Sequence, residues 1–397
     1  MKYRKDKYNN QISQLGYGCM RFTKKGTAID LEKAEKELLR GIELGINYLD
    51  TAYLYPGSEE ALGRILDKNN LRKKVNIATK LPQYMVRTSE AIDKIFNEEL
   101  TRLKTDYVDY YLMHMFTDVS EWEKLKGLGI EKWIADRKAD GSIRNIGFSY
   151  HGDTDMFIKI LDAYDWDFCQ IQYNYLDEHS QAGRRGLEAA YEKEIPVIIM
   201  EPLRGGKLVN IPAEAKKVIA QKGRDYTPAE LGLRWLWDQP GVTCVLSGMN
   251  SIEMVEENAR VASDAEAGNF DDNDREIVEE VKKIIKAKDK VGCTACRYCM
   301  PCPKGVDIPG NFYYYNLMYM EGKNSARYNF AQSMALREEP CFASQCVGCG
   351  KCEQHCPQHL PIREKLKEAD KALRPWPFKI GMKLARKIIL RKGSNKK

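Results

Sequence analysis

The chain has 397 residues, of which 43% are hydrophobic and 30% are charged, a composition typical of a globular protein. Its first residues, MKYRKDKYNNQIS, lack the apolar core of a signal peptide. No uninterrupted apolar stretch is long enough to span a bilayer. These features argue against a secreted or membrane-spanning protein and predict a cytoplasmic one.

The net charge of +6 is unevenly distributed. Residues 371–397 contain ten Lys or Arg and no acidic residue, which leaves 53 basic and 57 acidic residues in the rest of the chain. The main body therefore lacks the basic field that nucleic-acid binding requires, and we expect no nucleic-acid partner.

Short apolar runs alternate with amphipathic stretches over the first 260 residues. The runs are SQLGYGCM (13–20), INYLD (46–50), VNIATK (75–80), YVDYYLMH (107–114), IRNIGFS (143–149), FCQIQY (168–173), PVIIM (196–200) and TCVLSG (243–248). Between them lie segments such as LEKAEKELLRGIELG (31–45) and SEEALGRILDK (58–68), which are apolar at the three- and four-residue spacing of helices. Continuous apolar strands separated by helices are typical of parallel strands buried on both faces.

Eight such units predict a (β/α)8 barrel, the TIM-barrel fold. The first run is not followed by G-x-G-x-x-G, which argues against an open doubly wound sheet. Residues 1–12 are expected to form a short hairpin that closes the barrel bottom.

The pattern changes after about residue 263. DDNDREIVEEVKKIIKAKDK (271–290) predicts a final helix and linker, and a cysteine-rich segment follows. We therefore predict an α/β barrel over residues 1–285, a small α-helical module over 286–370 and a basic tail over 371–397.

Polar side chains follow several apolar runs at their carboxyl ends, where a (β/α)8 barrel builds its active site. Asp50 and Tyr55 follow the second run, Lys80 ends the third and His114 ends the fourth. Such residues need partners beside apolar strands, and the simplest partners are one another. A Lys ammonium lowers the pKa of a neighbouring Tyr, an Asp keeps the Lys charged, and a His orients a carbonyl oxygen. This set predicts proton donation to an alkoxide as a hydride reaches the carbonyl carbon.

The segment LDTAYLYPGSEEALG (49–63) resembles the signature DTA-x-x-Y-x-x-SE of the aldo-keto reductase superfamily. Lys80 in ATKLP and His114 in YYLMHM complete the family's tetrad with Asp50 and Tyr55. The resemblance covers about residues 1–262. It implies a barrel that binds NAD(P)H in an extended form and interconverts small carbonyls and alcohols.

The same resemblance assigns residues to the nucleotide. Ser149 and Gln172 match the family's carboxamide ligands, although Tyr150 replaces the usual Asn, and Met200 stands where the family often stacks a Tyr on the nicotinamide. The remaining expected contacts are Pro202, Leu203, Arg204 and Gly206 in EPLRGG, which supplies backbone amides for a pyrophosphate, and Glu257 and Asn258 in EEN, where the family contacts adenine.

The sequence differs from the family pattern at the positions that bind the 2′-phosphate of NADP. Gly248 and Met254 stand at the positions of the family's common Lys and Arg, so Arg204 or Lys207 would have to substitute. Other residues keep two interpretations. Tyr53 is an alternative to Tyr55 as the functional tyrosine. His151 and His179 are expected in loops or on the surface, and the alternative for His151 is that it lines the substrate pocket.

Nine of the twelve cysteines lie between residues 293 and 356. The run Cys346-x2-Cys349-x2-Cys352-x3-Cys356-Pro357 has the spacing of bacterial ferredoxins, in which the fourth Cys ligates the other cluster of a pair. Zinc ribbons need a longer loop between C-x2-C pairs, and cysteines so close in sequence are badly placed for disulfides.

The first run, Cys293, Cys296, Cys299 and Cys302, is one residue short before its last Cys. With the ferredoxin crossover, Cys293, Cys296, Cys299 and Cys356 would hold one [4Fe–4S] cluster, and Cys302, Cys346, Cys349 and Cys352 the other. Cys302 is then the ligand with the least regular spacing, and Cys341 is left without a role in either set. A single cluster instead of two remains an alternative. His355 and His359 are interpreted as flanking polar residues. The segment resembles the dicluster ferredoxin module carried by a subset of aldo-keto reductases.

In the tail, Ile380, Leu384 and Ile388 recur at four-residue steps among basic residues in 378–392. This pattern fits a helix on an anionic membrane surface or an acidic partner, or a solvated helix on the protein's own body. The leading hypothesis for the whole chain is an NAD(P)-dependent oxidoreductase coupled to, or regulated by, iron–sulfur clusters. The role of the clusters stays open between electron exchange with another protein, redox sensing and a structural role. The alternatives are a nucleotide-binding redox sensor or scaffold with little turnover, and a ferredoxin-type electron carrier.

Overall fold

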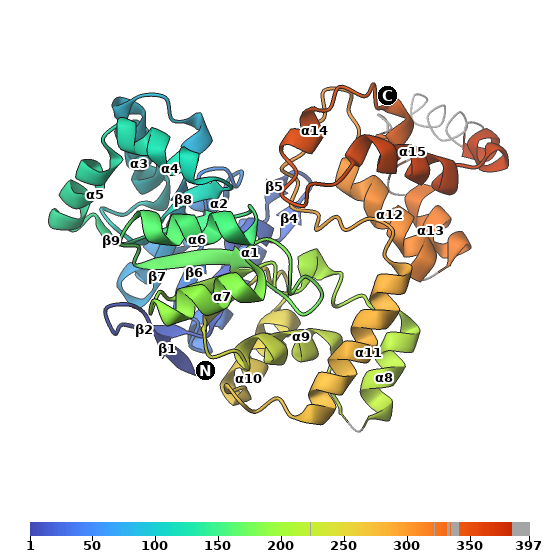
Figure 1. Ribbon diagram of the computed structural model, residues 1–397, viewed down its shortest axis with the longest axis horizontal. Coiled ribbons are helices and arrows are strands. Elements are labelled where there is room, and N and C mark those ends of the chain that lie inside the picture. Colours follow the sequence, from blue (N-terminus) through green and yellow to red (C-terminus); the bar gives the residue numbers. More distant parts are fainter. Residues whose placement is uncertain (223, 321, 332–333, 335–340, 383–397) are drawn as a thin grey trace. The chain divides into compact units, whose positions relative to one another are not determined.

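The computed structural model describes residues 1–222, 224–320, 322–331, 334 and 341–382 (Figure 1). Its contacts divide into two compact units. The first unit consists of Met1–Leu203 and Ala229–Asp274, and the second consists of Arg204–Pro228 and the chain from Arg275 onward. Residues 204–228 thus separate from the barrel that precedes them in sequence and belong to the second unit.

Eight parallel strands form a closed barrel in the first unit. In chain order they are β3 (Leu15–Gly18), β6 (Tyr48–Asp50), β7 (Asn76–Leu81), β8 (Val108–Phe116), β9 (Ile143–Tyr150), β10 (Phe168–Gln172), β11 (Val197–Met200) and β12 (Val242–Ser247). The pairing of β12 with β3, in which Val245 lies opposite Leu15, closes the ring. Each strand lies within one predicted apolar run or overlaps it, so the predicted (β/α)8 fold is confirmed.

A two-stranded antiparallel sheet precedes the barrel, as predicted for residues 1–12. β1 (Tyr3–Lys5) pairs with β2 (Gln11–Ser13). Ile12 is 1% exposed and packs inside the barrel with Tyr110 and Phe168. The Tyr110 hydroxyl donates to Asp6 Oδ2 at 2.7 Å, so the hairpin seals the amino-terminal end of the barrel.

Helices alternate with the strands of the first unit. They are α1 (Leu31–Glu43), α2 (Ser58–Lys68), α3 (Ser89–Leu103), α4 (Val119–Gly127), α5 (Ile130–Ala139), α6 (Thr154–Ala163), α7 (Gly183–Glu192), α9 (Pro228–Trp237) and α10 (Ile252–Asp264). Several begin at side-chain caps, such as Asp30, which accepts from Lys33 N. Two further strands, β4 (Lys24–Lys25) and β5 (Ala28–Ile29), form a small hairpin.

One close helix contact lies beside the candidate active-site loop. A Cβ at Gly63 in α2 would stand 2.4 Å from the carbonyl oxygen of Arg102 in α3. Only glycine allows this approach, and it fixes α2, which directly follows the loop that carries Tyr55.

The second unit is helical. Its helices are α8 (Ala213–Gln221), α11 (Asp272–Lys288), α12 (Ile308–Met320), α13 (Lys323–Phe330), α14 (Lys351–Gln354) and α15 (Ile362–Leu373). Side chains of α12 and α15, including Phe312 and Leu366, form its buried core with Phe330. The predicted final helix over 271–290 is confirmed as α11, and the predicted α-helical character of the C-terminal module is confirmed.

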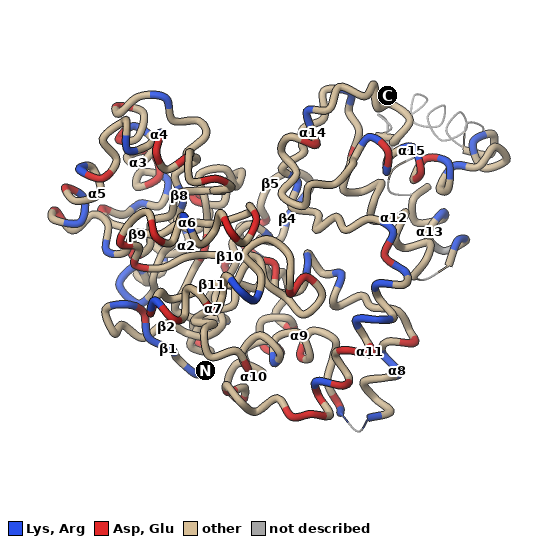
Figure 2. Tube along the Cα trace, viewed as in Figure 1, with Lys and Arg blue, Asp and Glu red and all other residues tan. Residues whose placement is uncertain are grey.

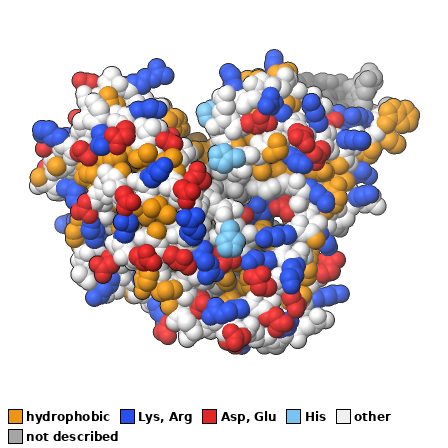
Figure 3. Space-filling view, in the orientation of Figure 1, with side chains coloured by type: hydrophobic (Ala, Val, Ile, Leu, Met, Phe, Trp, Pro, Cys, Tyr) orange, Lys and Arg blue, Asp and Glu red, His pale blue; other side chains and the backbone are white. Residues whose placement is uncertain are grey.

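Charged side chains of both signs are intermingled along the described chain and on the face of the molecule in view (Figures 2 and 3). Within the described residues, no helix combines the length and the apolar character needed to cross a membrane. Residues 376–382 of the tail are helical, and the rest of the predicted tail helix lies outside the described residues.

Candidate active site and cysteine centre

Three of the four tetrad residues lie on adjacent strands of the barrel. Asp50 ends β6, Lys80 lies near the end of β7 and His114 lies in β8. They are 4%, 0% and 1% exposed, respectively. Tyr55 follows in the loop after β6 and is partly exposed, so its side chain is the member of the set that is open to solvent.

Lys80 and Asp50 form a buried ion pair. The Lys80 Nζ donates to Asp50 Oδ2 at 2.6 Å and to the Thr51 carbonyl oxygen at 2.6 Å. Burial raises the pKa of the Asp50 carboxyl, while the adjacent Lys80 ammonium works against that rise. The Thr51 carbonyl gives the ammonium a second acceptor, which offsets part of the cost of burying it.

Tyr55 lies against both basic members of the set. The Lys80 Nζ is 5.2 Å from the centroid of the Tyr55 ring. The His114 ring meets the Tyr55 ring edge to face, with centroids 6.1 Å apart. The four predicted residues are therefore brought together, with a tyrosine ring next to a lysine that an aspartate holds in place.

The His114 imidazole is neutral at physiological pH. Burial lowers its pKa well below the usual value, and the charges of Lys80 and His151 lower it further. A neutral imidazole donates from one ring nitrogen and accepts at the other. His114 can therefore donate a hydrogen bond to a carbonyl oxygen without acting as an acid.

The two tyrosines of the motif have different surroundings. The Tyr53 hydroxyl donates to Glu98 Oε2 at 3.0 Å, and the Arg102 guanidinium carbon is 4.2 Å from the Tyr53 ring centroid. These partners belong to α3, outside the barrel. Tyr53 thus packs against α3, whereas Tyr55 contacts Lys80 and His114.

His151 was expected in a loop or on the surface, with the substrate pocket as the alternative. It follows β9, is 2% exposed and interacts electrostatically with His114. The expected loop position is confirmed, and the His151 amide donates to the Phe116 carbonyl oxygen at 2.8 Å. His179 is exposed, as expected.

The expected carboxamide residues are buried and already hydrogen-bonded. The Ser149 Oγ accepts from the Met115 amide at 2.8 Å. The Gln172 Oε1 accepts from Gln181 Nε2 at 2.6 Å, and the Gln172 Nε2 donates to Asp177 Oδ2 at 3.1 Å. Asp177 and Gln181 were missed in the sequence because they lie in an irregular loop that carries no periodic signal.

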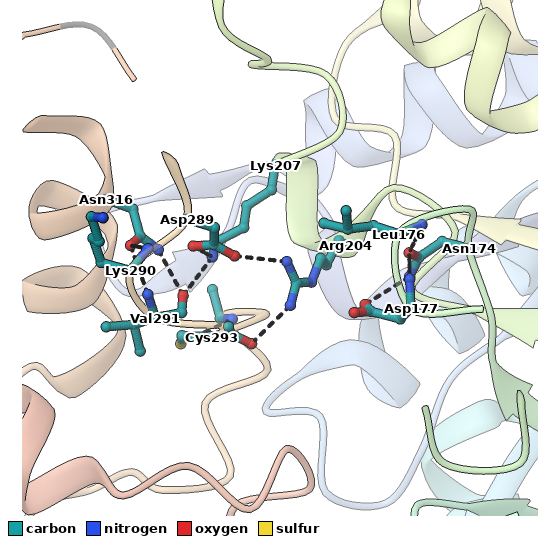
Figure 4. Close-up of polar contacts among 12 residues, drawn as sticks. Asn174, Leu176, Asp177, Arg204, Lys207, Asp289, Lys290, Val291, Cys293 and Asn316 are labelled. Carbon is teal, nitrogen blue, oxygen red and sulfur yellow. Dashed lines mark hydrogen bonds and ion pairs between the residues drawn. The ribbon is translucent and has the colours of Figure 1, made fainter. Parts of the chain in front are cut away.

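Asp177 has a second partner in the same loop. The Asn174 Nδ2 donates to Asp177 Oδ2 at 3.2 Å, and the Asn174 Oδ1 accepts from the amides of Leu176 and Asp177 (Figure 4). The loop after β10 is therefore held in a fixed turn that positions the acceptor for Gln172.

The loop after β11 has an unusual backbone. Met200 ends the strand opposite Gln172 and is partly exposed, and Pro202 is buried. Glu201 and Arg204 have left-handed φ angles of 53° and 51°, and Gly206 has a φ of 94°. A turn of this kind can direct successive backbone amides at an anion. Leu203 packs against Gly232, where a Cβ would stand 2.8 Å away from its Cδ2.

Arg204 and Lys207 share an acidic partner that the sequence did not indicate. The Arg204 Nη1 donates to Asp289 Oδ2 at 2.8 Å, and the Lys207 Nζ is 3.3 Å from Asp289 Oδ1 (Figure 4). Burial lowers the pKa of Lys207, and Asp289 opposes that change. Both predicted phosphate contacts thus lie in the second unit, bound to the segment that precedes the first cysteine run.

The expected adenine residues lie on α10. Asn258 is buried and donates from its Nδ2 to Ser247 Oγ at 3.1 Å, while Glu257 is partly exposed. Gly248 lies under the exposed side chain of Arg21, whose Cδ would be 2.7 Å from a Cβ at that position. A cationic side chain therefore covers the site where the family's usual lysine is replaced by glycine.

Four cysteines surround one small cavity of the second unit. Cys293, Cys296, Cys299 and Cys356 all line it. Burial raises the pKa of the Cys299 thiol, and the charges of the other three sulfurs raise it further. The crowded sulfurs would be stabilised as thiolates by a cationic iron centre, so the donor set fits a cluster.

A second group forms around Cys352. Burial raises the pKa of its thiol, as do Glu353, Cys346 and Cys349. Cys302 packs against the apolar core of the same unit, and its place in this group stays a prediction. Cys341 is 7% exposed, with its Sγ 3.8 Å from Met334 Sδ, in keeping with its interpretation as spare.

All twelve cysteines, each within the described residues, are free of disulfides. Across the described residues, no group of three or more His, Cys, Asp or Glu is arranged to hold a single metal ion. A four-iron cluster places each cysteine on a different iron, so its ligands stand farther apart than those of one ion.

Comparison with known proteins places the barrel in a family. The model of the aldo/keto reductase family matches residues 14–283. The chain belongs to this family. A second match, to the 4Fe-4S dicluster domain, covers residues 292–360, and the protein is thus an aldo/keto reductase-type oxidoreductase with a C-terminal 4Fe-4S dicluster domain.

Relatives match the barrel over nearly their full length. The chain is 28% identical over 319 residues to the uncharacterized oxidoreductase YqkF of Bacillus subtilis, covering 70% of this chain and 93% of YqkF. The holo form of an aldo-keto reductase from Bacillus halodurans is 26% identical, with a TM-score of 0.58 over 71% of this chain and 96% of that one. An aldo/keto reductase from Klebsiella pneumoniae, solved with NADP and acetate, is 24% identical, with a TM-score of 0.56 over 71% and 94%.

Proposed function

We propose that the barrel interconverts a carbonyl and an alcohol, with Tyr55 as the general acid and base. The observation that carries this proposal is the contact of Tyr55 with His114 and with the Lys80–Asp50 ion pair. The chain's membership of the aldo/keto reductase family supports it. The substrate class is a small aldehyde or ketone and the corresponding alcohol.

Each side chain has one task in this proposal. The Tyr55 hydroxyl gives its proton to the carbonyl oxygen during reduction and takes one from the alcohol during oxidation. The Lys80 ammonium stabilises the resulting phenolate, and Asp50, 2.6 Å from the Lys80 Nζ, keeps the lysine charged. The neutral His114 donates a hydrogen bond that orients the carbonyl oxygen. Bound NAD(P)H supplies the hydride.

The proposed nucleotide site follows the family pattern. Ser149 and Gln172 would hold the carboxamide beside Met200, after exchange of the hydrogen bonds that Gln172 makes with Gln181 and Asp177. The left-handed turns of the loop after β11 support pyrophosphate binding by the backbone from Pro202 to Gly206. Asn258 and Glu257 are proposed to contact the adenine.

We also propose two [4Fe–4S] clusters. The cavity lined by Cys293, Cys296, Cys299 and Cys356 supports the first ligand set. The interactions among Cys346, Cys349 and Cys352 support the second, with Cys302 as its fourth member. These ligand sets would hold groups that supply one-electron transfer, and an electron-transfer protein is the partner that suits this chemistry. Reduced thiols and clusters accord with the cytoplasmic location predicted from the sequence.

The variant Tyr55→Phe tests the barrel assignment. We expect kcat for reduction of a panel of aldehydes and ketones, with NADH or NADPH, to fall by about 10²- to 10⁴-fold. Iron content and nucleotide affinity should match those of the unaltered protein, because Tyr55 is not among the proposed ligands of the clusters or of the nucleotide. Full turnover in this variant would refute the tetrad assignment. Nucleotide binding by the unaltered protein without turnover on any substrate would favour the sensor hypothesis.

A further inference from the structure

A groove lies beside the second proposed set of cluster ligands. It is lined by Cys346 and Gly348 of the cysteine loop, by side chains of α15 and by Trp376 of the segment that follows α15. α15 packs against α14, the short helix that carries Cys352 (Figure 1). All of the lining residues belong to the second unit. The groove therefore adjoins the loop that would hold one cluster.

The loop of this ligand set reaches the surface of the unit. Val347 is 62% exposed, and Cys349 is exposed, whereas the other seven proposed ligands are only partly exposed. The ligands of the first set instead enclose a small cavity. Electron transfer between two proteins becomes slow when much protein separates the two centres. The second ligand set is thus the more accessible of the two for a partner.

The charged side chains that line the groove are mainly basic. The basic ones are Arg363, Lys367, Lys371, Arg374 and Lys379, and the acidic ones are Glu353, Glu364 and Asp370. Arg363, Lys367 and Lys371 recur at four-residue steps and share one face of α15. The opposite face of the helix, with Leu366 and Leu373, is buried in the core of the unit. The groove therefore carries a net positive charge.

Two of the acidic residues bind cations of the groove itself. The Arg363 Nε donates to Glu353 Oε2 at 2.8 Å. Asp370 accepts from Arg374 Nη1 at 2.8 Å and lies 3.4 Å from Lys379 Nζ. Lys367 and Lys371, by contrast, are exposed and form no ion pair with any residue that the structure describes. These two lysines present positive charge that the described chain leaves unmatched.

The rest of the chain offers no acidic segment for the groove. Residues 383–397, outside the described part, contain seven Lys or Arg and no Asp or Glu. Their charge does not complement a basic surface. Trp376 in the groove is 75% exposed, and tryptophan and arginine are enriched where proteins bind one another. The features of the groove thus match an acidic surface of another protein.

We propose that this groove docks a protein that presents an acidic surface and carries a one-electron redox centre. One electron passes between that centre and the group held by Cys346, Cys349 and Cys352, so one centre is oxidised as the other is reduced, and no atom moves between the proteins. The inference rests on the proposed second cluster. An anionic membrane would also match the charge, but the exposed cysteine loop beside the groove favours a redox protein.

The positive charges of the groove speed the encounter. Opposite charges on two proteins raise the rate constant of association, and salt screens this attraction. Complexes of electron-transfer proteins bury little surface and are weak. Charge therefore decides how fast the partner arrives, while Trp376 contributes to how long it stays.

The test uses oxidised flavodoxin, an acidic one-electron carrier whose flavin colour reports its own reduction. The full-length, anaerobically reconstituted protein is reduced with dithionite, desalted and mixed with flavodoxin by stopped flow. In the variant Lys367→Glu with Lys371→Glu, we expect the second-order rate constant at low ionic strength to fall by about tenfold or more. The rates should converge near 1 M salt, where the screening length is about 3 Å. The Kd of flavodoxin for the oxidised protein, measured by calorimetry, should rise in parallel.

Three controls separate the groove from overall charge. Lys216→Glu with Lys217→Glu makes the same change in net charge on exposed positions of α8, outside the groove, and should keep the rate and the Kd. Cytochrome c, a basic one-electron carrier, should react faster with the groove variant than with the unaltered protein. Trp376→Ala should raise the Kd of flavodoxin and leave the salt dependence of the rate unchanged. All of these proteins should contain about eight irons per chain.

Absent flavodoxin binding, or equal rates and Kd values in the groove variant and the α8 variant, would overturn the proposal. Binding to phosphatidylserine vesicles that is lost in the groove variant, with transfer to flavodoxin unchanged, would also overturn it and assign the groove to a membrane surface. Low iron content in the unaltered protein would instead count against the proposed clusters. The comparison of Kd values would then still decide the docking surface.

Discussion

The candidate active site and the candidate cluster sites rest on different kinds of backbone. Asp50, Lys80 and His114 lie on barrel strands and are at most 4% exposed. Seven of the eight proposed cluster cysteines lie outside helices and strands, and all eight are partly or fully exposed. The barrel therefore orders its polar groups through its own core, whereas the cysteine loops depend on the group that they bind. This difference predicts which changes each unit tolerates.

Loss of one cluster ligand should have the largest effect. Cys352→Ser is expected to reduce iron from about eight to about four per chain, because each [4Fe–4S] cluster contains four irons. The irregular segment around Cys346 and Cys349 should then become sensitive to protease, since binding of the group contributes directly to folding of its site. Iron assay and limited proteolysis with mass spectrometry measure both outcomes.

Cys341→Ser is the matched control in the same module. Cys341 is buried beside Met334, and its replacement should retain the full iron content. Loss of about four irons in Cys341→Ser would identify it as a ligand. An unchanged iron content in Cys352→Ser would remove that residue from the proposed set.

Loss of one partner of the buried ion pair in the barrel should lower the stability of the barrel without changing the iron content. Lys80→Met leaves the Asp50 carboxylate buried without its cation, and breaking a buried pair in this way costs about 3–5 kcal/mol. Five of the six tryptophans lie in the first unit, so urea unfolding followed by tryptophan fluorescence reports mainly on the barrel. The exposed Lys68→Met is the control.

The double variant Asp50→Asn with Lys80→Met removes both charges and should recover part of the lost stability. If Lys80→Met is as stable as the unaltered protein, the ion pair does not hold Asp50 in a charged state. Altered iron content in the single variant would show that the two units are not independent in stability.

The difference in backbone also explains what the sequence reveals. The strands are continuous apolar runs, and the cysteines follow a fixed local spacing, so both are visible in short segments. Asp50, Tyr55, Lys80 and His114 were predicted because each follows a strand whose carboxyl end must face the same rim. The structure brings the four side chains together.

The missed features all depend on contacts between distant segments. Asp289 receives Arg204 and Lys207 across more than 80 residues, and no periodicity marks such a partner. Gln181 and Asp177 form hydrogen bonds with Gln172 because an irregular turn brings them next to it. His151 is buried in a loop, where its amide donates to the Phe116 carbonyl oxygen. Loops can place a polar residue on either side of the chain, and the sequence pattern does not distinguish the two.

The neutral state of His114 predicts a moderate pH effect that only the barrel should show. Burial, Lys80 and His151 hold the folded-state pKa of His114 well below the usual value, so the unfolded chain binds the proton more readily. Stability is then fully present above about pH 6.5 and falls as the pH drops, by about 1 kcal/mol between pH 6.5 and 5.5. His114→Asn should lack this contribution.

Urea unfolding of the unaltered protein and of His114→Asn at pH 7.5, 6.5 and 5.5 measures this contribution to stability. The difference between the proteins removes the effect of other titrating groups, including Asp50. An equal loss of stability in both proteins would show that His114 takes up a proton as readily in the folded protein as in the unfolded chain, which would also weaken its proposed role as a neutral hydrogen-bond donor.

The smallest effect is expected from the second tyrosine of the motif. Tyr53→Phe removes one hydrogen bond to Glu98 at the partly exposed surface of α3, and the expected loss of stability is about 1 kcal/mol or less, with turnover unchanged. Tyr55→Phe, two residues away, should instead abolish most turnover and change stability little. Steady-state kinetics and urea unfolding of the two variants side by side separate the roles. A large loss of turnover in Tyr53→Phe would mean that the loop after β6 exchanges the two tyrosines during the reaction, and that contact with Lys80 and His114 does not by itself identify the acid.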